Sequence, residues 1–413
     1  MRAFRLQQPI LRPTTRNNLF NNTKGSVLPK VVALLFSTTA MTKSTTASSP
    51  TKADIKLLAR LRKETQVSVT KARDALLSSN NDYKKALEWL EKDAIKSGAK
   101  KAEKVGDRVA GEGVIAIANT PNNDQSAIIE LGCETDFVAR SEVFELLAQN
   151  IARQAMFSVN EAANKGCGDG ALVNVSVDRL LEQPLNNPTT GNNNDDGSGD
   201  VSIKEAIVQT IGKLGENMIL RRAVIGTQSA TTSPDNDKVQ KIFGTYVHGG
   251  PKPSMPIGKI GALVSIDIHK SNTNTVLGDT VMTELKRLTR RLAQQVVGIN
   301  PKFLDAAELE NAVRAGKFDL ESYKAQQLEE AGGSGGDELV QSLVFLDQKF
   351  MFDESKTVRL AVEEIASGLR QSPGGEGIEG ISVSGFKRFE RGEGVEKKEA
   401  PDFAEQVREQ LNN

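Results

Sequence analysis

Cysteine and histidine are both scarce in this sequence. Its 413 residues contain 2 cysteines and 2 histidines. These are Cys133, Cys167, His248 and His269. Two cysteines cannot form a disulfide framework, and so few nitrogen and sulfur ligands exclude a typical zinc site. We therefore expect a reducing compartment and no bound metal.

The same scarcity narrows the catalytic options. A thiol nucleophile needs a basic group beside it, so a thiol hydrolase that uses Cys133 or Cys167 is only an alternative. The simpler interpretation of Cys133 is a small core residue on a strand. The phosphate-binding pattern GxxxxGK[ST] is missing, because Gly258 and Lys259 are followed by Ile260 instead of a hydroxyl residue. No GxGxxG pattern precedes an expected helix, so we expect neither an enzyme nor a cofactor.

Long hydrophobic runs and aromatic residues are few. Hydrophobic residues make up 38% of the chain and aromatic residues 5%. The longest apolar run, Val31 to Phe36, is far shorter than the ~20 residues that a membrane-spanning helix needs. These features exclude a multispanning membrane protein, and we expect no membrane partner.

Acidic residues are missing from the start of the chain. Lysine plus arginine and aspartate plus glutamate both number 53, but eight basic residues precede the first acid, Asp54. The remainder therefore carries 45 basic and 53 acidic side chains, a net charge of −8. Nucleic-acid affinity depends on neutralised phosphates, so we expect this acidic body to have no direct nucleic-acid partner.

The acid-free leading segment is rich in arginine, serine and threonine. This is the composition of an organelle transit peptide, so residues 1–52 are predicted to be a disordered transit peptide. The expected destination is the mitochondrial matrix, which the composition favours over a plastid. A disordered basic tail without targeting meaning is the alternative.

Residues 53–98 are expected to form a compact three-helix bundle. Their apolar residues recur at the spacing of amphipathic helices. The expected helices are Ala53 to Glu64, Val69 to Leu77 and Asp82 to Lys96. Asn81 and Asp82 offer an N-cap for the third helix, and Gly98 is expected to stop it. Residues 99–112 then form a basic linker.

After the linker the apolar period changes from helical to strand-like. Val114 to Ala118 and Ser126 to Leu131 flank a turn-rich cluster, which predicts a β-hairpin. Ser141 is expected to cap the amphipathic helix that follows. These elements belong to a first core subdomain, residues 113–183. Residues 184–200 contain almost nothing apolar and are predicted to be a disordered insertion.

The second half of the body mixes strands and helices in the same way. Ser202 and Glu205 have the spacing of a capping box that opens a helix ending at Gly215. The other expected elements are strands at 217–225, 244–247 and 259–268, a long helix at 279–297 and a polar helical stretch at 308–330. A second core subdomain, residues 201–338, and a C-terminal part, residues 339–413, follow from this order. The expected fold class is α+β.

One short segment stands out as a binding site. A strand ends at Cys133, and a polar turn then places Phe137 before the helix that Ser141 caps. Thr135 or Asp136 is expected to accept hydrogen bonds from the amides of this turn and so to fix the direction of Phe137. A large aromatic side chain on a rigid turn is typical of an anchor for a partner's pocket. The alternative is that Phe137 packs into its own core.

The segment Glu130-Leu-Gly-Cys-Glu-Thr-Asp-Phe-Val-Ala-Arg140 resembles the signature of the elongation factor Ts family. Further segments resemble that family in the same order. They are Leu61-Arg-Lys-Glu-Thr65, Ala72-Arg-Asp-Ala-Leu76, Gly215-Glu-Asn-Met-Ile-Leu-Arg-Arg222, Tyr246-Val-His-Gly249, Ile260-Gly-Ala-Leu263, and the stretch from Ser384 to Lys397. The likeness runs from about Asp54 to Val407.

The resemblance implies a fold and a function. The bundle is expected to be similar to a ubiquitin-associated domain, and the core to consist of two subdomains of β-hairpins and small antiparallel sheets packed with helices. The function implied is guanine-nucleotide exchange on an organellar elongation factor Tu, in its GDP-bound and nucleotide-free states. The family segment that matches Thr135, Asp136, Phe137 and Val138 disturbs the partner's magnesium ion. Arg140 and His248 are expected to be further partner contacts.

The sequence departs from the family pattern in two places. The family usually has a glycine-rich turn where this chain has Gln66-Val67-Ser68. The helical hairpin that is long in bacterial members is shortened here and broken at Gly332 to Gly336, which is similar to mitochondrial members. An adaptor that binds ubiquitin or nascent chains through the bundle is the alternative function.

Overall fold

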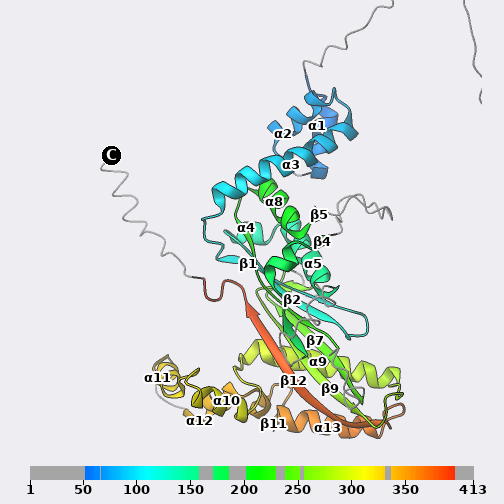
Figure 1. Ribbon diagram of the computed structural model, residues 1–413, viewed down its shortest axis with the longest axis vertical. Coiled ribbons are helices and arrows are strands. Elements are labelled where there is room, and N and C mark those ends of the chain that lie inside the picture. The colour runs from blue at the N-terminus through cyan, green and yellow to red at the C-terminus, as the bar shows by residue number, and fades with distance from the viewer. Residues whose placement is uncertain are drawn as a thin grey trace, which may run out of the picture. The chain divides into compact units, whose positions relative to one another are not determined.

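The structure of the protein is a computed structural model that describes residues 52–65, 67–157, 171–185, 201–228, 238–251, 255–330 and 336–395. These residues form antiparallel sheets packed with helices (Figure 1), which confirms the α+β class. The predicted transit peptide, apart from Lys52, lies outside the described residues, as does Cys167.

The N-terminal helices share a small apolar core. They are α1 (Ile55–Thr65), α2 (Val69–Ser78) and α3 (Tyr83–Val105). Asp82 caps α3 as predicted, because its carboxylate accepts hydrogen bonds from the amides of Lys84 and Lys85. Leu61 and Leu76 are fully buried in this core.

The predicted helix stop at Gly98 is wrong, because α3 continues to Val105. Gly98 instead lies where α3 packs against α8 (Ile203–Leu214). A Cβ atom at Gly98 would lie 2.5 Å from the carbonyl oxygen of Val208, and one at Gly212 would lie 3.0 Å from the Cα atom of Gly98. Glycine is therefore needed here for close packing of two helices and not to end one of them.

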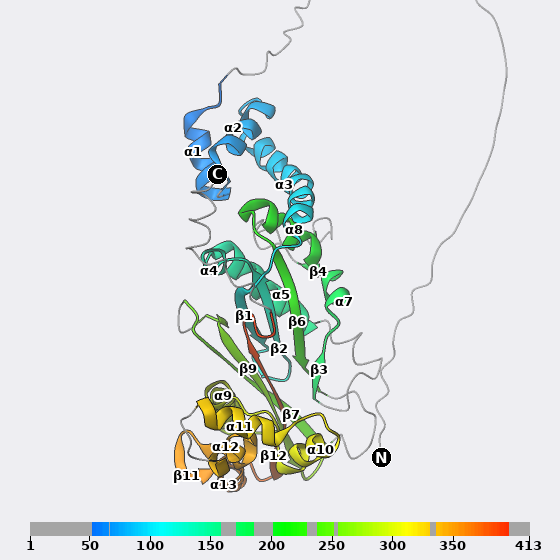
Figure 2. The ribbon, with the colours of Figure 1, turned by 90° about the vertical axis from the view of Figure 1, so that its left-hand side faces the viewer.

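The first sheet has the strand order β3-β6-β2-β1-β8. Its strands are β1 (Glu112–Asn119), β2 (Ser126–Cys133), β3 (Leu172–Asn174), β6 (Met218–Gly226) and β8 (Ile257–Gly258). β1 and β2 form the predicted antiparallel hairpin, with Ala116 opposite Ile129. The helix predicted after Ser141 is α5 (Glu142–Phe157), which packs on β1 and β2 (Figure 2).

The capping box of α8 is present as predicted. The hydroxyl of Ser202 accepts a hydrogen bond from the amide of Glu205, and the Glu205 carboxylate accepts one from the amide of Ser202. Gly215 ends the helix at a φ of 84°, which glycine adopts without steric cost. Two short elements, α7 (Val177–Leu181) and the strand pair β4 (Pro184–Leu185) and β5 (Val201–Ser202), complete this part of the chain.

One end of the predicted insertion is ordered. Pro184 and Leu185 pair with Ser202 and Val201, and Leu185 is buried in the core of the first sheet. That burial corrects the expectation for these two residues, because the Leu185 side chain gains more from the core than an exposed loop offers. Residues 186–200 lie outside the described residues.

The second sheet has the order β12-β9-β7. The helices packed on it, and the shorter elements around them, follow in chain order. The elements are β7 (Val239–His248), β9 (Ile260–Lys270), α9 (Asp279–Ile299), α10 (Ala306–Arg314), α11 (Leu320–Glu330), α12 (Gly336–Leu343), a 3-10 turn (Phe345–Asp347), β10 (Lys349–Phe350), β11 (Asp353–Thr357), α13 (Val358–Arg370) and β12 (Ile378–Glu390). α9 packs on β7 and β9, and α13 packs on β12. The polar stretch predicted at 308–330 thus comprises two helices, separated where Gly316 has a φ of 67°.

A shared apolar cluster joins the two sheets. Ile115, Ile128 and Val224 of the first sheet pack with Phe243 and Leu263 of the second. The face of the first sheet that does not carry α5 is therefore buried against the second sheet. This packing explains why all eight residues of β2 are buried.

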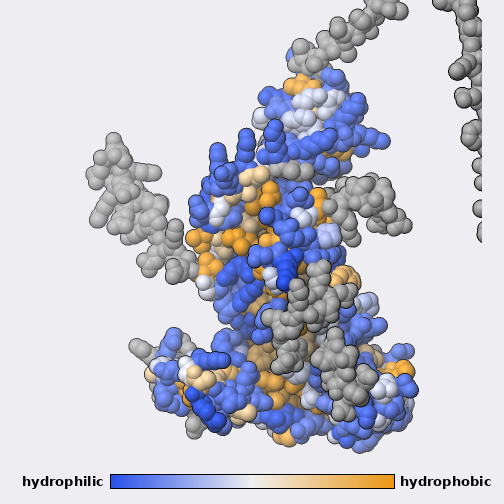
Figure 3. Space-filling view, viewed as in Figure 1, coloured by the Kyte–Doolittle hydropathy of each residue, from blue (hydrophilic) through white to orange (hydrophobic). Residues whose placement is uncertain are grey.

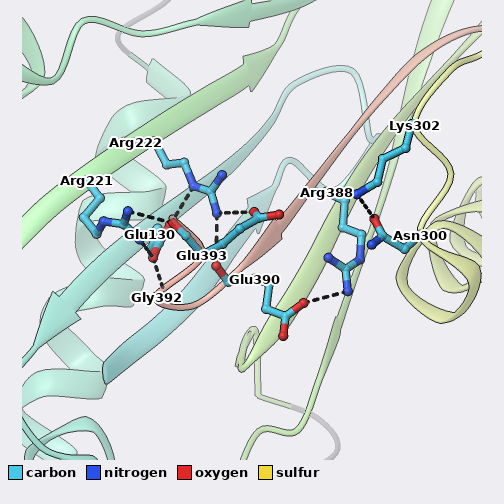
Figure 4. Close-up of polar contacts among 9 residues, drawn as sticks. All are labelled: Glu130, Arg221, Arg222, Asn300, Lys302, Arg388, Glu390, Gly392 and Glu393. Carbon is cyan, nitrogen blue, oxygen red and sulfur yellow. Dashed lines mark hydrogen bonds and ion pairs between the residues drawn. The ribbon is translucent and has the colours of Figure 1, made fainter. Parts of the chain in front are cut away.

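A buried ion-pair network also connects the sheets (Figure 4). Glu130 on β2 is 1% exposed, and its carboxylate accepts hydrogen bonds from Arg221, from Arg222 at 2.6 Å and from the Gly392 amide at 2.8 Å. Arg222 also contacts the Glu393 carboxylate at 2.9 Å. The network fastens the turn after β12 to the centre of the first sheet.

Candidate functional site

The segment between β2 and α5 contains the predicted binding turn. It forms a single short helix, α4 (Asp136–Ala139). Thr135 is the N-cap, and its hydroxyl oxygen accepts a hydrogen bond from the Val138 amide at 3.4 Å. The prediction that Thr135 or Asp136 accepts from the turn is therefore confirmed for Thr135. The Asp136 carboxylate instead pairs with Arg140 at 2.9 Å.

Phe137 points away from the protein's own core. Its side chain is 84% exposed, whereas Ala139 in the same helix is 3% exposed. Val138 is partly buried against the core of the first sheet. The alternative that Phe137 packs internally is therefore wrong. In Figure 3, hydrophobic residues are visible on the surface near the position that α4 has in Figure 1.

A second loop, between α8 and β6, holds the N-terminus of α4. The Glu216 carboxylate accepts two hydrogen bonds from Thr135, one from its amide at 3.0 Å and one from its hydroxyl at 2.6 Å. In the opposite direction, Glu134 accepts a hydrogen bond from the Asn217 amide at 2.6 Å. We call this exchange between residues 134–135 and 216–217 the glutamate clasp.

Asn217 extends the clasp to the end of α3. Its side-chain amide donates to the carbonyl oxygens of Gly106 at 3.2 Å and Arg108 at 2.8 Å, and it is 4% exposed. Sequence reasoning missed Glu134, Glu216 and Asn217 as site residues. The available signal was a polar Glu-Asn pair between a helix-ending glycine and a buried strand, where polar side chains must find partners.

The two further contact candidates lie in different places. Arg140 follows α4 directly, is exposed, and pairs with Asp136. His248 is the last residue of β7 in the second sheet, and its side chain is exposed. Among the described residues, no hydrogen bond or ion pair joins His248 to residues 134–140. The structure thus brings Thr135, Asp136, Phe137, Val138 and Arg140 together in one turn and leaves His248 separate.

Cys133 is a core residue, as the simpler interpretation expected. It is fully buried at the end of β2, and its thiol donates to the Thr135 carbonyl oxygen at 3.2 Å. Burial, followed by the negative charges of Glu216 and Glu112, raises the pKa of Cys133 to about 12. A thiol that stays protonated at neutral pH is a poor nucleophile, so Cys133 does not support the thiol-hydrolase alternative.

This environment predicts slow reaction of Cys133 with thiol reagents. In a Cys167→Ser protein, we expect Ellman's reagent at pH 8 to react at least about a hundredfold more slowly with native than with urea-unfolded chains, because the buried thiol must first become exposed. The native pKa of Cys133 exceeds the ordinary value of 9.0, so the stabilisation is complete below pH 9.0 and is lost as the pH rises toward 12. Equal rates in the native and unfolded protein would contradict this.

Two other kinds of site were considered. Within the described part of the chain, no group of three or more His, Cys, Asp and Glu residues is arranged to hold a metal ion. No described helix combines the length and apolarity required to span a bilayer. The turn that carries Phe137 is therefore the strongest candidate site.

Comparison with known proteins agrees with this choice. The family model described as elongation factor TS matches residues 134–393, so the match begins at the clasp. A protein named "Elongation factor Ts, mitochondrial" from Coprinopsis cinerea is 38% identical over 274 residues, which cover 63% of this chain and 77% of that protein. Proteins of the same name from Nematostella vectensis and Dictyostelium discoideum are 32% identical over 349 residues and 27% identical over 388 residues. These alignments cover 82% of this chain and 99% of the relative, and 94% of this chain and 98% of the relative.

These matches first define a class, that of the translation elongation factors. More closely, the chain belongs to the elongation factor Ts family. The resemblance that the sequence motifs indicated is therefore confirmed.

Proposed function

We propose that this chain is a guanine-nucleotide exchange factor for an organellar elongation factor Tu. It binds the GDP-bound partner, promotes release of GDP, and leaves the emptied site to GTP. The observation that carries this proposal is the exposure of Phe137, which is 84% accessible on a short helix whose other residues are fixed. An aromatic side chain presented in this way is suited to enter a pocket of another protein.

Each residue of the turn has a distinct role in this proposal. Phe137 is the wedge, Thr135 caps the helix that carries it, and Val138 holds that helix against the core. Asp136 and Arg140 form an ion pair beside the wedge and contact the partner, and His248 is a further contact from the second sheet. Residues 53–98 dock on the partner's nucleotide domain, and the two core subdomains grip it.

The mechanism needs no covalent step. In a GTPase, bound GDP is held jointly by backbone amides, a lysine and a bridging magnesium ion. An apolar wedge that displaces a neighbouring helix of the partner weakens the metal and phosphate contacts together. Because the wedge lowers the barrier between the bound and empty states, it accelerates nucleotide release and nucleotide binding alike. The excess of GTP over GDP then sets the direction.

Thermodynamic linkage provides the test of this function. If the chain weakens GDP binding by some factor, GDP must weaken binding of the chain by the same factor. Isothermal titration of the full chain into nucleotide-free and into GDP-bound elongation factor Tu should therefore give a lower dissociation constant for the empty partner. Equal dissociation constants for both states would contradict the proposal.

We also propose that the protein acts in the mitochondrial matrix, where relatives named mitochondrial elongation factor Ts are expected by their names. Residues 1–52 carry eight basic residues and no acidic one, which suits an import signal. Fused to a fluorescent reporter, this segment should direct the reporter into mitochondria and be removed there. A reporter that stays in the cytosol or enters plastids would contradict the proposed location.

A further inference from the structure

We propose that Glu216 is a positioning residue for nucleotide exchange, which fixes the direction of Phe137 by holding Thr135. The inference rests on the proposed exchange function. Glu216 belongs to a loop 81 residues away in sequence from the residue that it holds. Its role is to orient the wedge, and it need not touch the nucleotide.

The helix that carries Phe137 cannot fix its own orientation. It contains four residues, whereas isolated helices shorter than about 12 residues are marginal in water. The exposed Phe137 side chain gains little orientation from packing. The direction of the ring therefore depends on how the two ends of the helix are fastened.

The fastenings at the two ends differ in kind. At the C-terminal end, the Ser141 hydroxyl donates to the Val138 carbonyl oxygen at 2.8 Å, and Arg140 pairs with the exposed carboxylate of Asp136. Both contacts are local, so they move with the helix. At the N-terminal end, Glu216 comes from a separate loop and can resist a rotation of the whole turn.

The geometry of the contact is suited to such a role. Both carboxylate oxygens of Glu216 bind the same residue, one the Thr135 amide and the other the Thr135 hydroxyl. Together they fix a backbone group and a side-chain torsion at once. The Thr135 hydroxyl donates its proton to Glu216, so a lone pair of the same oxygen is aimed at the Val138 amide. Hydrogen bonds to a charged acceptor are stronger than neutral ones.

Glu216 is itself held in place. It follows Gly215, which ends α8, and precedes Asn217, whose amide donates to Glu134 and whose side chain binds the carbonyl oxygens after α3. The clasp therefore connects the ends of α3 and α8 to the first residue of the turn. A site built on such rigid elements keeps its geometry under load better than one held by loop contacts alone.

The test compares Glu216→Ala with Glu216→Gln in the full chain. Release of fluorescent GDP from elongation factor Tu is measured against the concentration of the chain, which separates the maximal rate from the half-saturating concentration. We expect Glu216→Ala to lower the maximal rate about tenfold, equivalent to the loss of one hydrogen bond to a charged group. The half-saturating concentration should change less than about twofold, because the remaining contacts with the partner are intact.

Glu216→Gln should restore most of the maximal rate. Its amide oxygen can accept from the Thr135 amide while its amide nitrogen donates to the Thr135 hydroxyl oxygen. A rate as low as that of Glu216→Ala would overturn the hydrogen-bond account. In a double-mutant cycle, Glu216→Ala should add no further loss to Thr135→Val, since both remove the same contact. Additive losses would contradict action through Thr135.

A matched control distinguishes positioning from general destabilisation. Glu205→Ala removes the capping box at the other end of α8 and lowers stability without touching the turn, so its maximal rate should equal that of the parent. An equal loss in Glu205→Ala and Glu216→Ala would overturn the proposal. A parent that accelerates release, together with a Glu216→Ala variant of parental rate, refutes the positioning role alone. A parent that never accelerates release refutes the proposed function itself.

Discussion

Replacing Phe137 with alanine is expected to slow GDP release roughly thirtyfold while leaving the protein folded. Truncation of an interface anchor typically costs about 2 kcal/mol or more, which corresponds to that change in rate if the energy is used in the exchange-competent state. The side chain is 84% exposed, so its removal forfeits little burial within the protein's own structure. Thermal melts and stopped-flow release of fluorescent GDP on the same preparation measure both effects.

Phe157 offers a control for this variant. It is also an exposed phenylalanine, 61% accessible at the end of α5, and no role in binding is assigned to it. Phe157→Ala should therefore change neither the melting temperature nor the release rate. The wedge account is contradicted if Phe137→Ala exchanges at the parental rate, or if it melts far below the parent while its folded fraction exchanges normally.

The largest effect on stability is expected at Glu130. Its carboxylate is 1% exposed and accepts from Arg221, Arg222 and the Gly392 amide. Removal of one partner from a buried charge network leaves the others unpaired, which typically costs about 3 to 5 kcal/mol. We expect Glu130→Ala to lower the free energy of unfolding by this amount in urea titrations followed by circular dichroism. The loss should also release the turn after β12 from the first sheet.

An exposed glutamate provides the comparison. Glu182 has a side chain that is 71% exposed and contacts Lys204 at 3.8 Å. Pairs of this kind contribute roughly 0 to 1 kcal/mol, so Glu182→Ala should scarcely change the urea midpoint. If the two variants unfold within about 1 kcal/mol of each other, the network does not stabilise the fold as described.

The local elements could be predicted because their signals are local. Alternation of apolar residues indicated the β1–β2 hairpin, and the Ser202 and Glu205 spacing indicated the start of α8. The exposure of Phe137 was one of two interpretations that the sequence left open. A single turn of chain does not show on which side of a helix the core will lie.

The missed features all depend on partners distant in sequence. Glu130 stands in an apolar strand, and nothing near it shows that Arg221 and Arg222 will neutralise its charge. Glu216 binds Thr135 across 81 residues. Gly98 carries the usual signal for a helix stop, but the close approach of α8 decides its role. Tertiary packing therefore set the details that local propensity could not.

The most direct measurement is the rate at which fluorescent GDP leaves an organellar elongation factor Tu in magnesium-containing buffer, with excess unlabelled nucleotide and increasing full-length chain. The account predicts that the rate rises with the concentration of the chain to a plateau far above spontaneous release, and that Phe137→Ala reaches a much lower plateau. A release rate that stays at the spontaneous value at every concentration of the chain would contradict it.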